Sequence, residues 1–247
     1  MSLEQYLDAT YLKTAAQAGI SKKENVRIVE QNIQEAIQYD FKLIMIRPEF
    51  VSLAKTRIVE AKSKLCIGTV IDFPKGDNST QFKVVEAKKA ILDGADELDF
   101  VLDYEAFKRG EMTMVKEQVL TCTKLALENN KVVKWIIEVA ALSHHQIIQL
   151  CVLIKNVIIA NFKESFYDHV FVKSSTGFYQ TQDGLPNGAT VETIKIMLEN
   201  AFPLPVKAAG GVRNYEEAIE MIKLGVKRIG TSAAKAIVEG KESNSEY

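Results

Sequence analysis

The sequence predicts a single-domain (β/α)8 TIM barrel of the α/β class. Short apolar runs rich in β-branched residues alternate with amphipathic segments of helical length, which is the pattern of strands joined by helical crossovers. Strands joined in this way are parallel and covered on both faces, as in an open doubly wound sheet or a closed barrel. Eight runs within 247 residues favour the barrel, which typically takes roughly 250 residues.

The expected strands are spaced so that a helix fits between each pair. They are Tyr6–Ala9, Leu43–Ile46, Leu65–Ile71, Glu97–Leu102, Val133–Val139, Val170–Lys173, Val206–Ala208 and Lys227–Ile229. Polar pairs mark several helix starts: Ser21 with Glu24 and Ser143 with Gln146, which have capping-box spacing, and the similar pair Asn214 with Glu217. We expect the barrel to occupy residues 1–238 and the polar segment 239–247 to be a flexible tail.

Composition narrows the classes of protein to consider. Lys and Arg (31) nearly balance Asp and Glu (32), so no overall field would draw the chain to nucleic acid or to an anionic membrane. No apolar run reaches the roughly 18 residues that span a bilayer, and no export signal is evident. The three cysteines are widely separated and argue against a disulfide framework or a structural zinc site. We therefore expect a soluble, cytoplasmic protein that binds neither nucleic acid nor membranes.

Several expected strands contain charged residues, although a buried charge costs several kcal/mol unless it is paired or neutralised. These residues are Asp99, Lys134, Glu138, Lys173 and Lys207. Lys173 and Lys207 lie near the carboxyl ends of their strands, where barrels of this type carry out their chemistry. For Glu138, both pairing with a barrel lysine and membership of a wider charge network are open.

Two lysines that face the same mouth of the barrel would lower each other's proton affinity, because two ammonium groups repel in a partly dry site. A neutral amine can attack a carbonyl and form an iminium ion, which accepts electrons when a neighbouring carbon–carbon bond breaks. Asp99 is the best-placed carboxylate for the proton transfers. From the charges alone, the alternative that these lysines are ion-paired structural residues is equally well supported.

Two glycine-containing loops follow the last two expected strands, where many barrels bind phosphate. Gly210 and Gly211 follow the seventh strand, and Gly230-Thr231-Ser232 follows the eighth. Glycines allow backbone N–H groups to approach phosphate oxygens, and the helix that opens near Ser232 would direct its positive end to the anion. Gly177 could supply a further donor. The sequence thus favours a substrate that carries both a carbonyl and a phosphate.

The chain resembles the deoxyribose-phosphate aldolases, which are class I aldolases built on a (β/α)8 barrel. The resemblance covers nearly the whole chain and is carried by residues 6–13 (YLDATYLK), 94–101 (GADELDFV), 133–138 (VKWIIE), 171–178 (FVKSSTGF) and 206–213 (VKAAGGVR). It implies reversible cleavage of 2-deoxy-D-ribose 5-phosphate to acetaldehyde and D-glyceraldehyde 3-phosphate in deoxyribose phosphate catabolism. It also implies no metal and no organic cofactor.

The resemblance assigns roles to individual positions. Lys173 is similar to the lysine that forms the imine, and Lys207 to the neighbour that lowers its pKa. Asp99 matches the carboxylate of the proton transfer, Asp8 matches an acidic residue that supports the substrate and the second lysine, and Tyr247 matches a terminal tyrosine that assists proton exchange. The phosphate-binding positions are Gly177, Gly210, Gly211, Gly230 and Ser232. After Gly230 this chain reads Thr231-Ser232-Ala233-Ala234, where relatives often have two consecutive serines, so one hydroxyl contact to phosphate is either absent or moved to Thr231. Relatives are commonly homodimers.

Other functions remain open at this stage. A different Schiff-base barrel, similar to transaldolase or to fructose-bisphosphate aldolase, would keep a lysine at a strand end. A non-catalytic barrel that senses a sugar phosphate would keep that lysine protonated. A divalent-metal aldolase is disfavoured because His144 and His145 lie at an expected helix start and His169 has no partner at ligand spacing.

Overall fold

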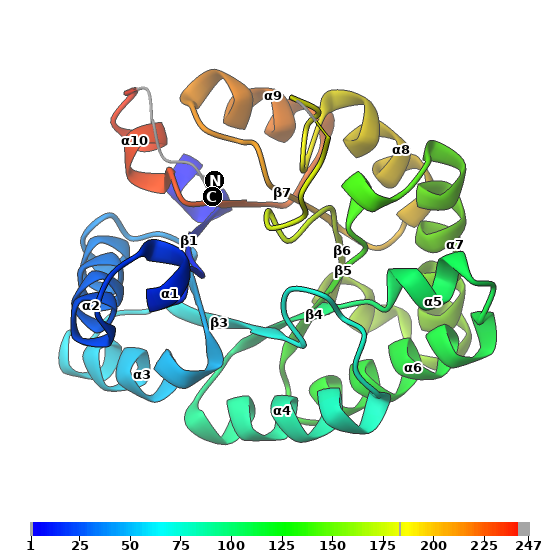
Figure 1. Cartoon of the computed structure of the whole chain (residues 1–247), viewed down its shortest axis with the longest axis horizontal. Coiled ribbons are helices and arrows are strands. Elements are labelled where there is room, and N and C mark those ends of the chain that lie inside the picture. Colours follow the sequence, from blue (N-terminus) through cyan, green and yellow to red (C-terminus); the bar gives the residue numbers. More distant parts are fainter. Residues whose placement is uncertain (1, 183, 242–247) are drawn as a thin grey trace.

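The strands of the computed structural model, which describes residues 2–182 and 184–241, close into a barrel in chain order, each parallel to the next (Figure 1). They are β1 (Leu7–Tyr11), β2 (Leu43–Ile46), β3 (Cys66–Ile71), β4 (Glu97–Val101), β5 (Val132–Ile136), β6 (Val170–Lys173), β7 (Val206–Ala209) and β8 (Arg228–Thr231). The predicted fold class is confirmed, and so is each of the eight predicted strands.

Helices surround the barrel as an outer layer (Figure 1). The α-helices of the described residues are α1 (Ala15–Ala18), α2 (Lys22–Gln38), α3 (Val51–Glu60), α4 (Thr80–Asp93), α5 (Tyr104–Lys108), α6 (Met112–Glu128), α7 (His144–Asn161), α8 (Val191–Ala201), α9 (Tyr215–Leu224) and α10 (Ala234–Val238). Short 3-10 helices span Leu3–Tyr6, Pro48–Phe50, Val139–Ala141 and Glu164–His169. Across residues 2–182 and 184–241, no helix is both long and apolar enough to cross a membrane.

The predicted helix starts are confirmed, with one difference in detail. Ser143 and Gln146 form a complete capping box at the start of α7. The hydroxyl of Ser21 accepts from the amide of Glu24, but the return bond of a capping box is not formed there. Asn214 caps α9 by accepting from the amide of Glu217.

The expected fifth strand was three residues too long. The sequence prediction carried it to Val139, whereas β5 ends at Ile136. Glu138 has a φ of 57°, in the left-handed region, so the chain turns out of the sheet there. The run Ile136-Ile137 continues the apolar pattern past the end of the strand, and for this reason the sequence pattern did not reveal the turn.

Alternate residues of each strand face the helices and form the main core. Trp135 of β5 illustrates this layer: its ring stacks on Phe100 of β4, and its indole N–H donates to the hydroxyl of Thr123 in α6 at 3.0 Å. Trp135 therefore faces the surrounding helices. The intervening residue, Lys134, therefore faces the interior of the barrel.

The interior of the barrel is divided into a charged part and an apolar part. Asp8, Asp99, Lys134, Lys173, Lys207 and Arg228, from β1 and β4 to β8, are all buried. A small separate cluster of Leu12, Leu43, Met45 and Val70 fills the side of β2 and β3, with Phe73 and Phe178 packed against it. We refer to this cluster as the apolar wall.

Candidate active site

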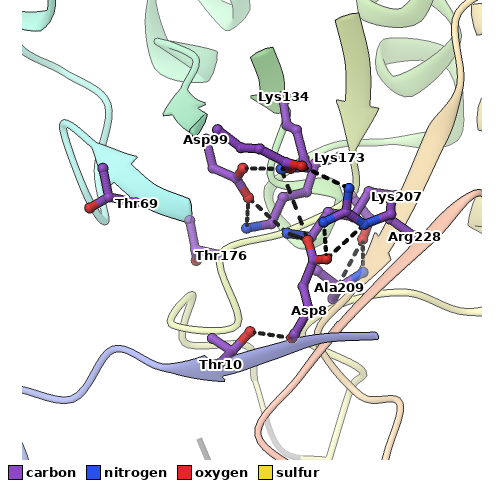
Figure 2. A network of polar contacts seen from close by, with 12 residues as sticks. Asp8, Thr10, Thr69, Asp99, Lys134, Lys173, Thr176, Lys207, Ala209 and Arg228 are labelled. Atoms are coloured by element: carbon purple, nitrogen blue, oxygen red, sulfur yellow. Dashed lines mark hydrogen bonds and ion pairs between the residues drawn. The ribbon is translucent and has the colours of Figure 1, made fainter. Parts of the chain in front are cut away.

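Side chains from four strands meet inside the barrel (Figure 2). Lys173, the last residue of β6, lies opposite Lys207 of β7 in the parallel register, so the two side chains face the same side. Both Nζ atoms donate to one oxygen, Oδ2 of Asp99, at 2.8 Å from Lys173 and 2.9 Å from Lys207. Nζ of Lys207 also lies 2.6 Å from Oδ2 of Asp8 in β1. The structure thus brings together four of the side chains that the sequence assigned to the chemistry.

Three more charged side chains belong to the same network, and the sequence analysis did not assign them to the site. Lys134 donates to Oδ1 of Asp99 at 2.9 Å and to the carboxylate of Glu97. Arg228 donates to Asp8 at 2.7 Å and to Oε1 of Glu97 at 3.0 Å. A signal was present, because Glu97 lies two residues before Asp99 and must face the same side of β4.

The charges of this network balance when Lys173 is neutral. The carboxylates are Asp8, Glu97 and Asp99, and the other cations are Lys134, Lys207 and Arg228. Burial opposes ionisation of the carboxylates, but the cations beside them outweigh burial and lower the pKa of all three. A net charge in a buried network is costly, and the neutral form of Lys173 leaves none.

The pKa of Lys173 is accordingly low, at about 8 instead of the ordinary 10.5. Burial is the largest cause, because it disfavours the ammonium form. Asp99 opposes this effect and raises the pKa, whereas the positive charge of Lys207 lowers it further. Lys207 thus acts in the direction that the sequence analysis expected, but burial contributes more. A lysine with this pKa supplies a neutral amine near neutral pH.

The loops that follow β6 and β7 touch each other backbone to backbone. Gly177, Gly210 and Gly211 all have positive φ angles, of 82°, 81° and 90°. The amide of Ala189 donates to the carbonyl of Gly210 at 2.8 Å. A Cβ atom on Gly188 would lie 2.4 Å from that carbonyl oxygen, so only glycine fits at position 188. The sequence analysis did not single out Gly188.

Comparison with protein families identifies the chain. A model of the DeoC/LacD family aldolases matches residues 12–240. The chain belongs to this aldolase family.

Relatives of this aldolase match it over nearly their whole length. The deoxyribose-phosphate aldolase of Thermococcus gammatolerans is 40% identical over 241 residues, which cover 97% of this chain and 96% of that protein. The deoxyribose-phosphate aldolase of Lactococcus lactis subsp. lactis is 39% identical over 248 residues, and the match covers 100% of both chains. The tetrameric deoxyribose phosphate aldolase from Aeropyrum pernix superposes with a TM-score of 0.74 at 27% identity, over 96% of this chain and 89% of that chain.

In this aldolase the end of β8 is tied to the segment after β7. The sequence analysis placed Gly230 and Thr231 after the eighth strand, but both lie within β8. The hydroxyl of Thr231 donates to the carbonyl of Val212 at 2.7 Å and accepts from the amide of Ala233 at 2.9 Å. Gly230 lies within β8, where a Cβ atom would be 3.0 Å from Cε of Lys207. Gly230 therefore makes room for the Lys207 side chain. Ser232 is exposed at the surface.

Two residues of the sequence analysis have a different outcome in this aldolase. Glu138 pairs with no lysine among the described residues; it accepts instead from the amide of Thr176 at 3.2 Å and from the Thr176 hydroxyl. Tyr247 lies outside the described residues, as does most of the expected tail 239–247. Glu239, at the start of that segment, accepts a hydrogen bond from the hydroxyl of Tyr39 at the end of α2.

Proposed function

We propose that this aldolase reversibly cleaves 2-deoxy-D-ribose 5-phosphate to acetaldehyde and D-glyceraldehyde 3-phosphate through an imine on Lys173. The observation that carries this proposal is the contact of Lys173, at the carboxyl end of β6, and of Lys207 with one oxygen of Asp99. The names of the relatives from Thermococcus and Lactococcus support the choice of sugar. The role in deoxyribose phosphate catabolism follows from that reaction.

The charged residues around Lys173 can carry out each step of the proposed cleavage. The neutral amine of Lys173 attacks C1 of the open-chain sugar, and the carbinolamine loses water to give a protonated imine. Asp99, acting with a water molecule, removes the proton of the 3-hydroxyl group, and the C2–C3 bond breaks. The electron pair of that bond moves to the imine and forms an enamine, while glyceraldehyde 3-phosphate leaves. The enamine takes up a proton at carbon, and hydrolysis of the imine releases acetaldehyde and regenerates Lys173.

The remaining charged residues serve this sequence in our proposal. Lys207 lowers the pKa of Lys173 and lies between Asp99 and Asp8, at 2.9 Å and 2.6 Å. Asp8 holds Lys207 in place and supports substrate binding. The positive charge of Lys207 near the reacting carbon would also stabilise oxygen as negative charge develops on it.

We further propose that the 5-phosphate binds to the loops after β6 and β7 and to the carboxyl end of β8 with the residue that follows it. The positions are Gly177, Gly210, Gly211, Gly230, Thr231 and Ser232. The positive φ angles of Gly177, Gly210 and Gly211 support this choice, because a backbone of this kind can direct N–H groups at an anion. Thr231 contributes by tying its loop to Val212.

Three further proposals concern the surroundings of the reaction. We propose that the tail 239–247 carries Tyr247 to the site, where the phenol assists proton exchange at the acetaldehyde carbon. We propose a homodimer in the cytoplasm, to which the free thiols of Cys66, Cys122 and Cys151 are suited. Light scattering tests the dimer against the chain mass of 27.6 kDa, and Tyr247→Phe tests the tyrosine through the rate of hydrogen exchange into acetaldehyde.

The central experiment combines trapping and turnover. Acetaldehyde with borohydride should leave a reduced two-carbon adduct on the peptide that contains Lys173, and Lys173→Met should abolish it. The folded protein should also cleave 2-deoxyribose 5-phosphate much faster than 2-deoxyribose. If the folded protein forms no adduct, the imine mechanism is wrong.

The same assays separate the competing functions. An enzyme similar to transaldolase or to fructose-bisphosphate aldolase would form an imine with its own ketose substrate and would not cleave deoxyribose 5-phosphate. A non-catalytic sensor would bind the sugar phosphate without any adduct. The pKa of about 8 for Lys173 gives a larger neutral fraction near pH 7 than an ordinary lysine has, and this favours the imine over the sensor.

A further inference from the structure

Glu138 is a buried carboxylate beside the site for which the proposed reaction has no role. It follows the end of β5 by two residues and has a φ of 57°, in a region that non-glycine residues rarely occupy. Its side chain is buried, with 1% of the residue exposed. A strained backbone that holds a buried acid next to a reactive lysine calls for a reason in the surrounding contacts.

One oxygen of Glu138 organises the loop after β6. Oε2 accepts from both the amide and the hydroxyl of Thr176. The oxygen of that hydroxyl accepts in turn from the amide of Phe178 at 3.0 Å. Gly177, with its left-handed φ of 82°, lies between these two fixed residues. Through these bonds, a single carboxylate oxygen fixes the backbone path of residues 176–178.

The loop held in this way reaches both sides of the site. Phe178 contacts the ring of Phe73 edge to face, with ring centroids 5.0 Å apart, and so joins the apolar wall. The side-chain amide of Asn187 donates to the carbonyl of Gly177 at 3.2 Å. Displacing Thr176 would thus change the direction of the Gly177 amide and the position of Phe178 together.

The other oxygen of Glu138, Oε1, is fully buried, as is the hydroxyl of Ser175. Neither atom has a hydrogen bond of good geometry among the described residues, but Ser175 is close enough to Glu138 to lower its pKa. The titratable groups that face Glu138 are Lys173, whose charge lowers the pKa of Glu138, and Tyr104, whose pKa of about 12 is raised by burial and by the charge of Glu138. Burial outweighs these effects and raises the pKa of Glu138. Burial of the Glu138 carboxylate therefore costs free energy, and its hydrogen bonds to Thr176 offset part of that cost.

We propose that Glu138 is a positioning residue that holds Thr176 so that the backbone of Gly177 is directed at the substrate phosphate. The inference rests on the proposed function, because it presumes a phosphorylated substrate. Glu138 acts through Thr176 and takes no part in the bond-breaking steps.

Steady-state kinetics with 2-deoxyribose 5-phosphate and with unphosphorylated 2-deoxyribose test this role. Glu138→Ala should raise KM for 2-deoxyribose 5-phosphate by about tenfold, the effect of losing hydrogen bonds to a charged group. It should leave kcat/KM for unphosphorylated 2-deoxyribose within about twofold, because the phosphate loop does not serve that substrate. Thr176→Val should raise KM for 2-deoxyribose 5-phosphate to a similar extent. Thr176→Ser keeps the hydroxyl and should therefore leave KM at the parental value. Equal losses on both substrates would overturn the proposal.

A double-mutant cycle isolates the contact from a general effect on folding. Glu138→Gln and Thr176→Val together should be no worse than the more damaging single variant, because both remove the same interaction. Additive losses would show that the two residues act separately. The control variant is Glu30→Gln, which loosens the contact of Glu30 with Arg57 on the outer helices and should change neither KM.

Hydrogen exchange provides a readout that does not depend on the reaction. Amides 176–178 should exchange at least about tenfold faster in Glu138→Gln or Glu138→Ala than in the parent protein, whereas β6 should stay protected. Unchanged exchange in these amides would refute the positioning role even in an active enzyme. Absence of the Lys173 adduct in the parent protein would instead refute the proposed function, so the two failures are distinguishable.

Discussion

Lys173 and Lys207 bind the same oxygen of Asp99, from adjacent strands and in direct register. Two ammonium groups that share one carboxylate oxygen in a buried site repel each other, and protonation of Lys173 would leave the network with an excess of positive charge. This arrangement makes the state of Lys173 sensitive to each of its charged neighbours. The first three predictions follow from this sensitivity.

The rate of imine formation should rise with pH and reach half its maximum near pH 8. The amine attacks only when neutral, and the pKa of Lys173 is lowered to about 8, so the fraction of reactive enzyme falls as the pH drops below that value. At pH 7 about a tenth of the lysine is neutral. Trapping with acetaldehyde and borohydride across pH 6 to 10 measures the midpoint. A midpoint near the ordinary lysine value of 10.5 would contradict the structure.

Lys207→Leu should move that midpoint upward and slow the reaction at pH 7. The charge of Lys207 lowers the pKa of Lys173, and its removal also leaves Asp99 to interact more strongly with Lys173. Each unit of upward shift cuts the neutral fraction at pH 7 by about tenfold. The same trapping assay measures it. Lys227→Leu, which removes an exposed charge next to β8, is the control, and identical midpoints in the two variants would argue against the role of Lys207.

Asp99→Asn should separate imine formation from turnover. The negative charge of Asp99 raises the pKa of Lys173, so its loss should lower the trapping midpoint below 8. Cleavage should nevertheless fall by about 10² to 10⁴, the usual contribution of a general acid–base group. Adduct mass and cleavage rate, measured on one preparation with circular dichroism as the check on folding, give both quantities. Full cleavage activity in a folded Asp99→Asn protein would exclude Asp99 from the proton transfer.

Gly188→Ala should weaken binding of the phosphorylated substrate. The added Cβ atom would lie 2.4 Å from the carbonyl oxygen of Gly210, so the loops after β6 and β7 must move apart. We expect KM for 2-deoxyribose 5-phosphate to rise about tenfold, the equivalent of about 1.4 kcal/mol. Gly184→Ala is the matched control in the same loop, because its Cβ would meet no atom within 4 Å. Its φ of 74° adds some backbone strain, so a smaller effect, not a null one, is expected.

Lys134→Met should destabilise the fold. Lys134 is fully buried and forms ion pairs with the carboxylates of Glu97 and Asp99. In the variant these two carboxylates would have one cation fewer beside them. Removing one partner of a buried ion pair typically costs about 3–5 kcal/mol, and methionine keeps most of the apolar stem. Urea denaturation at pH 7 measures the free energy of unfolding. Because the native carboxylates have lowered pKa values, the unfolded chain takes up protons first as the pH falls below about 4. The parent protein then loses more stability than the variant, so the difference between them should shrink.

The fold was predictable from the sequence because each strand has its own apolar run and each crossover its own helix. The charged residues of the strands pointed to the site for the same reason, since a lysine or an aspartate in a buried strand needs an explanation. Glu138 shows where this reasoning stops. It lies beside a continuous apolar run, and a pattern of hydrophobicity does not reveal a turn that depends on the left-handed backbone conformation of one glutamate.

The partners of the charges were less predictable than the charges themselves. Arg228 and Glu97 meet across the barrel, 131 positions apart in the chain, and such a contact depends on closure of β8 onto β1. Gly188 is required where its loop packs against the backbone of Gly210, and loop paths carry no periodic signal. Long-range geometry of this kind becomes visible only when all eight strands are in place.

The apolar wall has a consequence for the evolution of substrate range. Leu12, Leu43, Met45 and Val70 share the interior with the charged network, and their apolar side chains take no part in its hydrogen bonds and ion pairs. Mutations on this side can therefore reshape the room for the aldehyde without disturbing the protonation of Lys173. The barrel therefore separates its charged reactive groups from an apolar side, and we expect substitutions at Leu43, Met45 and Val70 to change the fit of the aldehyde without removing a partner of Lys173.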